Sequence, residues 1–190
     1  MSDSISFDLL VFRPATAARI TGVSVESQRD WRRRGLIARQ ASASGALHVA
    51  DLTLLALFST FSDLLGGPSA AATAARAFAA PILWRVLAAD RAWIDGEGGA
   101  ARATNVCAAL GLATPPAGRF GGVAGDIVLI AESVQSLIDD LAERGAVVIN
   151  LDQFAARLLD EIGAPVAAPA TVPELSLRNR PSQPEKDLLQ

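Results

Sequence analysis

Three arginines at close spacing are the side chains in this sequence best suited to bind a polyanion. Arg29, Arg32 and Arg33 lie in the stretch ATAARITGVSVESQRDWRRRGLI, residues 15–37. A guanidinium group presents a planar fork of N–H donors that matches phosphate oxygens and the edge of guanine in the DNA major groove. We therefore predict a helix over residues 24–34 that contacts DNA with these side chains. The alternative is an ordinary solvated helix face.

The residues around these arginines predict a helix–turn–helix. Pro14 suits the first turn of a helix over residues 14–20, because its missing N–H costs nothing there. Gly22 supplies the backbone conformation that a tight turn needs. Ser24 is a suitable N-cap for the second helix, and Gly35 ends that helix. A basic second helix in such a pair is typical of insertion into a major groove.

Further candidates for DNA contact lie around the second helix. Gln28 is either a polar residue of the core or a reader of bases, and the sequence leaves both interpretations open. Ser24 can combine its capping role with a DNA contact. Arg19, Arg39 and His48 are candidates for contacts with the phosphate backbone. His48 is the only histidine and suits an ordinary surface position equally well.

The first part of the chain resembles the MerR-type winged helix–turn–helix. The resemblance covers roughly the first 80 of the 190 residues and implies double-stranded DNA as partner, a wing over residues 39–48 and a dimeric regulator of transcription. It rests on these residues: Gly22-Val23-Ser24, Arg29, Trp31, Arg33-Arg34-Gly35-Leu36-Ile37, the loop 38–47, Val49-Ala50-Asp51-Leu52 and Leu64-Leu65-Gly66-Gly67-Pro68-Ser69.

Three features depart from the pattern of that family. Gln28 stands where the family usually has a buried leucine, and Asp30 replaces an aromatic residue. The wing lacks the usual arginines near its second strand, so Arg39 and His48 are its only candidates for phosphate contact. These departures favour an alternative function, a protein-interaction adaptor whose helix–turn–helix does not bind DNA.

The charge of the chain is unevenly distributed. The net charge is only −3, but residues 11–50 hold seven arginines against two acids. Residues 126–163 hold eight acids against two arginines. We therefore expect the first part alone to meet phosphates, and the acidic region 126–163 to be a solvated face or a surface for a protein partner.

Composition argues against several other kinds of chemistry. The single cysteine, Cys107, excludes an intrachain disulfide and a cysteine-based zinc site. With one histidine, no acid–base pair or metal cluster assembles, so we expect no enzyme, no metal and no cofactor. The stretch GRFGGVAG at residues 118–125 lacks the lysine of a phosphate-binding loop. No apolar run reaches the roughly 20 residues of a membrane helix, so we expect a cytoplasmic, nucleoid-associated protein without a membrane partner.

The expected fold class is mainly α with a small β component, in which a winged helix–turn–helix precedes a small α/β unit. Apolar residues at steps of three and four predict an amphipathic helix over residues 51–65. Pro81 would kink any long helix that runs through it. The expected domains are a DNA-binding domain at 8–80, a dimerisation or sensing unit at 81–163 and a flexible Pro/Ala-rich tail at 164–190.

The α/β unit is expected to form around a parallel pair of strands, because a strand–helix–strand order is typical of parallel pairing. Asp152 is the expected N-cap of the last helix. The expected elements after residue 112 are a loop at 113–125, a strand at 126–131, a helix at 132–144, a strand at 146–151 and a helix at 152–162.

These observations favour a sequence-specific transcriptional regulator that acts as a homodimer, because a single small module contacts few base pairs. A second hypothesis is a phage-type protein that organises DNA, such as an excisionase or a small terminase subunit. The third is the protein-interaction adaptor.

Overall fold

The structure is a computed structural model whose described residues form seven α-helices and two small antiparallel sheets, so the expected mainly helical fold with a small β component is confirmed. It describes residues 7–35, 46–65, 68–112, 118–125, 127–141 and 145–169. The elements are β1 (Phe7–Leu9), α1 (Pro14–Thr21), α2 (Val25–Arg33), α3 (Val49–Leu65), α4 (Pro68–Ala88), the 3₁₀ helix η1 (Asp90–Ala92), α5 (Ala100–Ala109), β2 (Phe120–Ala124), β3 (Ile127–Ala131), α6 (Val134–Leu141), β4 (Val147–Asn150), α7 (Leu151–Ile162) and β5 (Ala167–Pro169).

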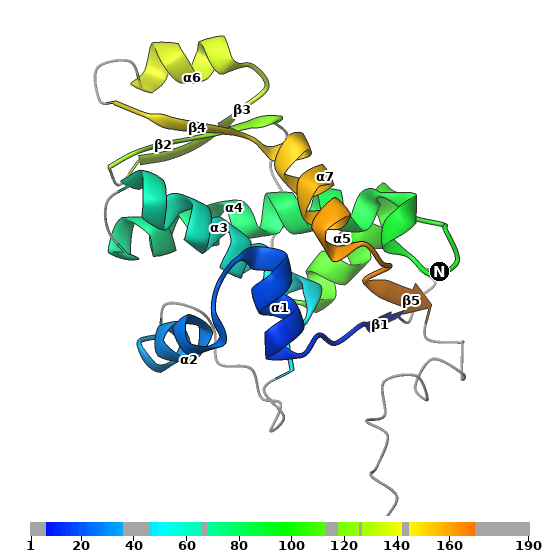
Figure 1. Cartoon of the computed structure of the whole chain (residues 1–190). Helices are drawn as coiled ribbons and strands as arrows, with labels where there is room; N and C mark the ends of the chain where they lie inside the picture. The colour runs from blue at the N-terminus through cyan, green and yellow to red at the C-terminus, as the bar shows by residue number, and fades with distance from the viewer. Residues whose placement is uncertain are drawn as a thin grey trace, which may run out of the picture.

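Helix α4 lies at the centre of the molecule and packs against α3, α5 and α7 (Figure 1). Its first half is rich in alanine, which favours the helix and lets the neighbouring backbone come close. The helix continues through Pro81, which is itself buried and cannot donate a backbone hydrogen bond. Ten of its residues are buried, so α4 belongs to the core along most of its length.

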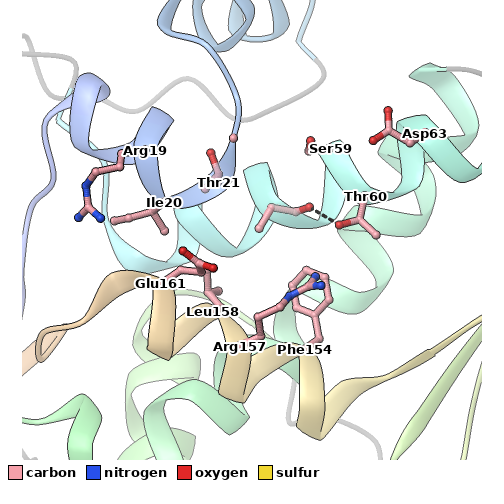
Figure 2. Close-up of a pocket in the computed structure, with 12 residues that line it drawn as sticks. Arg19, Ile20, Thr21, Ser59, Thr60, Asp63, Phe154, Arg157, Leu158 and Glu161 are labelled. Atoms are coloured by element: carbon pink, nitrogen blue, oxygen red, sulfur yellow. Dashed lines mark hydrogen bonds between the residues drawn. The ribbon is translucent and has the colours of Figure 1, made fainter.

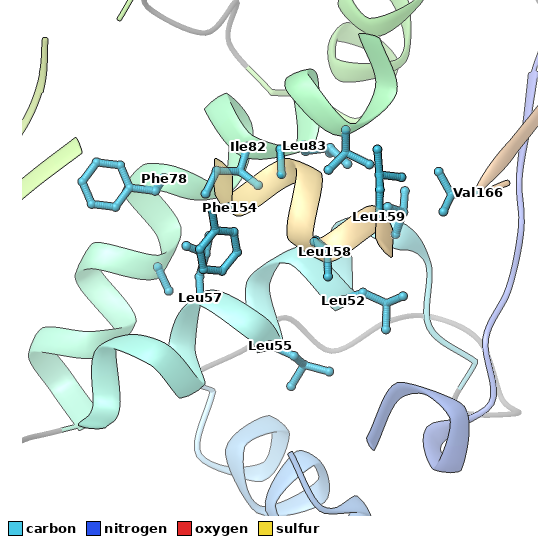
Figure 3. Close-up of a cluster of buried hydrophobic side chains, with 14 of the residues drawn as sticks. Leu52, Leu55, Leu57, Phe78, Ile82, Leu83, Phe154, Leu158, Leu159 and Val166 are labelled. Carbon is cyan, nitrogen blue, oxygen red and sulfur yellow. The ribbon is translucent and has the colours of Figure 1, made fainter. Parts of the chain in front are cut away.

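The hydrophobic core forms where α3, α4 and α7 meet (Figure 3). Leu52 of α3, Ile82 of α4 and Leu158 of α7 are among its buried side chains. The same cluster reaches from Ala17 of α1 to Ala167 of β5, so it includes residues on both sides of the expected domain boundary at residue 80. Helices α1 and α2 therefore rest on a core that α7 helps to build.

The two ends of the described chain meet in a small sheet. Strand β1 pairs with β5 in antiparallel fashion, with Phe7 opposite Pro169 (Figure 1). The backbone N–H of Leu10 donates to the carbonyl of Val166 (2.9 Å), and Val166 is fully buried. The part of the expected tail up to Pro169 is thus included in the fold, whereas residues 170–190 lie outside the described residues.

The second sheet differs from the expected parallel pair. Its strand order is β3-β2-β4, and β2 pairs in antiparallel fashion with both neighbours. Strands β3 and β4 are therefore separated by β2, which forms from residues expected to be a loop. Two glycines make the sequence of β2 unlike that of a typical strand, but the close packing around β2 requires glycine at both positions. A Cβ at Gly121 would collide with the ring of Phe78 from α4, and one at Gly122 would lie 2.7 Å from Leu141 of α6.

The start of α7 also differs from the expectation. Asn150, not Asp152, is the N-cap, since its Oδ1 accepts a hydrogen bond from the backbone N–H of Gln153 (3.0 Å). Asp152 lies in the first turn and pairs with Arg85 of α4 (2.7 Å) and Arg119 (2.9 Å). This carboxylate therefore joins α4, α7 and the segment that precedes β2.

Candidate nucleic-acid interface

The turn between α1 and α2 is built as the sequence predicts. Gly22 adopts the left-handed conformation (φ 72°), and its N–H donates to the carbonyl of Ala18 at the end of α1. Ser24 is the N-cap of α2, and its Oγ accepts a hydrogen bond from the backbone N–H of Ser27 (3.0 Å). These local bonds fix where α2 begins and in which direction it leaves α1.

Gln28 is buried beneath α2. Its side chain has no exposed surface, and Nε2 donates to the carbonyl of Val23 (2.9 Å) and to that of Pro14 (3.1 Å). The amide therefore ties the middle of α2 to the turn and to the start of α1. The sequence left two interpretations of Gln28 open, and its burial is that of a polar core residue. Gln28 does not belong to the exposed surface of α2.

Trp31 attaches the same face of α2 to the core. Its ring lies 4.2 Å from that of Phe58 on α3, measured between centroids. Trp31 is three residues after Gln28, so the two side chains lie on one side of the helix. With this side held against the protein, the opposite side of α2 faces outward, and Figure 1 shows α2 at the edge of the molecule.

The outward side of α2 carries arginines in two different environments. Arg29 is exposed and forms no ion pair with any residue in the described part of the chain. Arg33 and Arg34 both pair with Asp30, at 2.5 and 2.7 Å, while their side chains remain 77% and 60% exposed. Because Arg29 and Arg33 are four residues apart, they are neighbours on one helix face.

Arg32 and His48 are turned more toward the protein than the sequence suggests. Arg32 Nη2 and His48 Nδ1 are buried and make no hydrogen bond. The backbone N–H of His48 donates to Asp51 Oδ2 (2.8 Å) in the first turn of α3. Burial raises the pKa of the Asp51 carboxyl above its ordinary value, although that hydrogen bond and the charges of His48 and Arg32 oppose the shift. The two side chains therefore belong to the junction of α2 and α3.

The structure adds Arg76 of α4, which sequence reasoning missed. Its Nη2 donates to the carbonyl of Gly35 (2.8 Å), just beyond the end of α2. Arg76 is exposed, so a second helix contributes a guanidinium group next to the C-terminal end of α2. No local signal identifies it, because Arg76 and Gly35 are 41 positions apart in the sequence.

Two further candidates lie elsewhere. Arg19 is an exposed residue of α1 that lines a groove between α1, α3 and α7, together with Glu161 (Figure 2). Arg39 and most of the expected wing lie outside the described residues. The residues that the structure brings together are therefore Arg29, Arg33, Arg34 and Arg76, which we term the basic surface.

The basic surface presents guanidinium groups on a helix that is held in place from behind. Such groups donate to phosphate oxygens and, in a major groove, to the edge of guanine. Asp30 limits how far Arg33 and Arg34 can move, because it pairs with both. Among the α2 arginines of the basic surface, Arg29 can make such a contact without first breaking an ion pair to a described residue.

Comparisons with known proteins add no assignment. No protein-family model matches the chain, and a search of curated proteins found no match. The candidate interface therefore depends on the geometry described above.

Within the described stretches, no three side chains of the histidine, cysteine, aspartate and glutamate types form a group that could hold a metal ion. The described helices also include none that is both long and apolar enough to cross a membrane.

Proposed function

We propose that this protein is a sequence-specific DNA-binding regulator of transcription and that α2 is its recognition helix. The proposal places the basic surface against double-stranded DNA, with Arg29 and Arg33 directed into the major groove. It includes a winged helix–turn–helix as the DNA-binding element and a cytoplasmic, nucleoid-associated location.

One observation supports the proposal more than any other. Helix α2 has an inner face fixed by the Gln28 amide and the Trp31 ring, and an outer face that carries exposed arginines. A recognition helix needs both properties, because side chains read bases only when the backbone that carries them is held in register.

The proposal also includes a homodimer. One module of this size contacts few base pairs, and two copies on a two-fold symmetric site give the specificity that a regulator needs. The proposal leaves dimerisation, or contact with a protein partner, to the unit 81–163 and to its acidic region 126–163.

The test begins with selection of bound fragments from a random DNA library, followed by binding titrations on the enriched sequence. We expect Arg29→Ala to weaken specific binding by about 1–3 kcal/mol, because a base or phosphate contact is lost. Arg91→Ala is the matched control, since Arg91 is exposed on η1 and pairs with Asp160 of α7. Equal affinity of folded Arg29→Ala and the wild type would contradict the assignment of α2.

The protein-interaction adaptor remains a second candidate because of Asp30. This residue pairs with two of the α2 arginines and reduces the positive charge available to a phosphate. DNA binding through guanidinium groups falls steeply as salt rises, since counterions are released on binding. An adaptor would instead show no DNA binding at low salt and would bind a protein partner with little dependence on salt.

A further inference from the structure

A groove lies where the helix–turn–helix meets the C-terminal helix. It has a volume of about 380 Å³, within the size range typical of small-molecule sites. Figure 2 shows its three walls, which are α1, α3 and α7.

Part of the groove floor is apolar, although most of the exposed lining is polar. Ile20 of α1 and Phe154 and Leu158 of α7 line it, and each is buried in the fold with less than a tenth of its surface exposed. An apolar group placed against this part of the floor leaves water and gains contact with Ile20 and Leu158. The floor therefore suits an aliphatic or aromatic group of a ligand.

The rim of the groove carries charges of both signs. Arg19 and Arg157 are cationic, while Asp63 and Glu161 are anionic. None of these four side chains forms an ion pair with any described residue, although they line one groove. The Arg157 guanidinium lies over the Phe154 ring, 5.2 Å from its centroid, and Figure 2 shows both projecting from α7 toward α3. A small ligand with two opposite charges complements such a rim.

We propose that this groove binds a small zwitterion with an apolar side group, of the class of aliphatic and aromatic α-amino acids. The ligand carboxylate pairs with Arg157, whose guanidinium is steadied by the ring beneath it. The ligand ammonium pairs with a rim carboxylate, Asp63 or Glu161. The apolar side group covers Ile20 and Leu158.

The position of the groove gives such a ligand a regulatory effect, and this part rests on the proposed DNA binding. Helix α1 supplies one wall and is joined to α2 by the Gly22 turn, while α7 supplies the opposite wall. A ligand that contacts both walls favours one arrangement of α1 on the core. DNA affinity then changes with ligand concentration, because only a ligand that binds two arrangements unequally shifts their populations.

The test uses the full chain and calorimetric titration with L-leucine and L-phenylalanine in the absence of DNA. Two leucine analogues dissect the charges: 4-methylpentanoate lacks the amine, and 3-methylbutylamine lacks the carboxylate. We expect each analogue to bind about tenfold or more weakly than leucine, because one charge-assisted contact is lost. Equal affinity for leucine and both analogues would contradict the charge argument.

Two arginine variants locate the site. Arg157→Gln is expected to reduce leucine affinity about tenfold or more while leaving the already weak binding of 3-methylbutylamine unchanged, since that amine has no carboxylate to lose. Arg29→Gln, on the basic surface, is the matched control and is expected to bind leucine as the wild type does. Thermal unfolding of each variant shows that it is folded.

The outcomes separate this proposal from the proposed function. Absence of heat with every amino acid at millimolar concentration, or equal leucine affinity in wild type and Arg157→Gln, overturns the ligand site whatever the DNA result. If leucine binds as expected but does not change DNA affinity, the site stands and the regulatory step is wrong. If Arg29→Ala and the wild type show no DNA binding at all, leucine binding still tests the groove independently.

Discussion

The pair of helices α1 and α2 and the β2–β4 sheet with α6 are attached to the same core in contrasting ways. Helix α2 is held largely by specific polar bonds, among them the two that the Gln28 amide donates, and by one aromatic contact. The sheet is held by close apolar packing, with Gly121 against Phe78 on one face and Gly122 against Leu141 on the other.

This difference explains what each region presents to its surroundings. A helix fixed by buried polar bonds needs little apolar surface, so the outer side of α2 is free to carry Arg29 and Arg33. The sheet unit depends on apolar burial and has a small local core, made of Ala124, Leu137 and Leu141. Part of its apolar surface stays exposed, including Ile138 of α6, which is 46% exposed. The two regions should therefore respond differently to changes in packing and in polar bonding.

The largest effect is expected from Gly121→Val in β2. A Cβ at this position collides with the Phe78 ring. Phe78 has little room to yield, because it is fully buried and stacks on Phe61 with 5.6 Å between ring centroids. Overpacking of this kind should lower the free energy of unfolding by about 3 kcal/mol. Denaturant titration measures the change, and DNA affinity of the folded fraction should stay at the wild-type level.

Val148→Ala is the control for that prediction, because Val148 lies on the edge strand β4 and is 38% exposed. It should change stability by less than about 1 kcal/mol. A Gly121→Val protein as stable as this control would show that the sheet is not held by close packing against α4.

A smaller effect on stability, with a larger one on function, is expected from Gln28→Leu. Leucine fills similar space but donates no hydrogen bond, so the carbonyls of Val23 and Pro14 lose the Gln28 amide. The expected loss of stability is about 1–2 kcal/mol, because removal of the unpaired Oε1 offsets part of the cost. We expect the loss of DNA-binding free energy to exceed the loss of unfolding free energy, since the angle between α1 and α2 is no longer fixed.

The same variant can also contradict the view that polar bonds hold α2 in place. If Gln28→Leu leaves both DNA affinity and stability unchanged, polar bonding does not hold α2, and the helix is packed like the sheet. Gln28→Glu is a useful second variant, because it adds a buried charge and should be less stable than Gln28→Leu.

The two regions also differ in how much of them could be predicted from the sequence. The positions of α1 and α2 follow from local signals: Gly22 for the turn and Ser24 for the cap act on residues within a few positions. The polar bonds beneath it join α2 to Pro14 and Val23, and the sequence left the position of Gln28 open. Arg76 approaches Gly35 from 41 positions away, which no local pattern reveals.

The sheet was predicted less well because its order depends on contacts between distant elements. The segments of β3, α6 and β4 were recognised from their apolar patterns, but β2 was expected to be a loop. Glycine is unfavourable in an isolated strand. Gly121 and Gly122 are nevertheless needed here, because helices approach this strand closely on both faces, and only the tertiary structure shows those helices.

Asp51 and Asp152 lie where helices meet, and their contributions to stability should depend on pH in opposite ways. Burial raises the pKa of Asp51, so its protonated form is favoured in the fold. Burial alone would also raise the pKa of Asp152. Hydrogen bonds from Arg119 and Arg85, with their charges, outweigh that effect and hold the pKa of Asp152 below its ordinary value. The stability from Asp51 is present below the ordinary pKa and is lost as pH rises through the raised one. The stability from Asp152 is present above the ordinary pKa and is lost as pH falls through the lowered one.

The smallest expected effect is therefore the pH dependence of Asp152→Asn. The Asp152 side chain is 43% exposed, so solvent screens its ion pairs, and the loss near neutral pH should be about 1 kcal/mol or less. The difference in unfolding free energy between wild type and Asp152→Asn should shrink as pH falls below about 4, where the carboxyl takes up a proton. Asp51→Asn should show the opposite trend. The unfolding free energy of the wild type relative to this variant should fall as pH rises from the ordinary pKa of aspartate through the raised pKa of Asp51. Urea unfolding at a series of pH values measures both, and parallel profiles for the two variants would show that the two carboxylates share one environment.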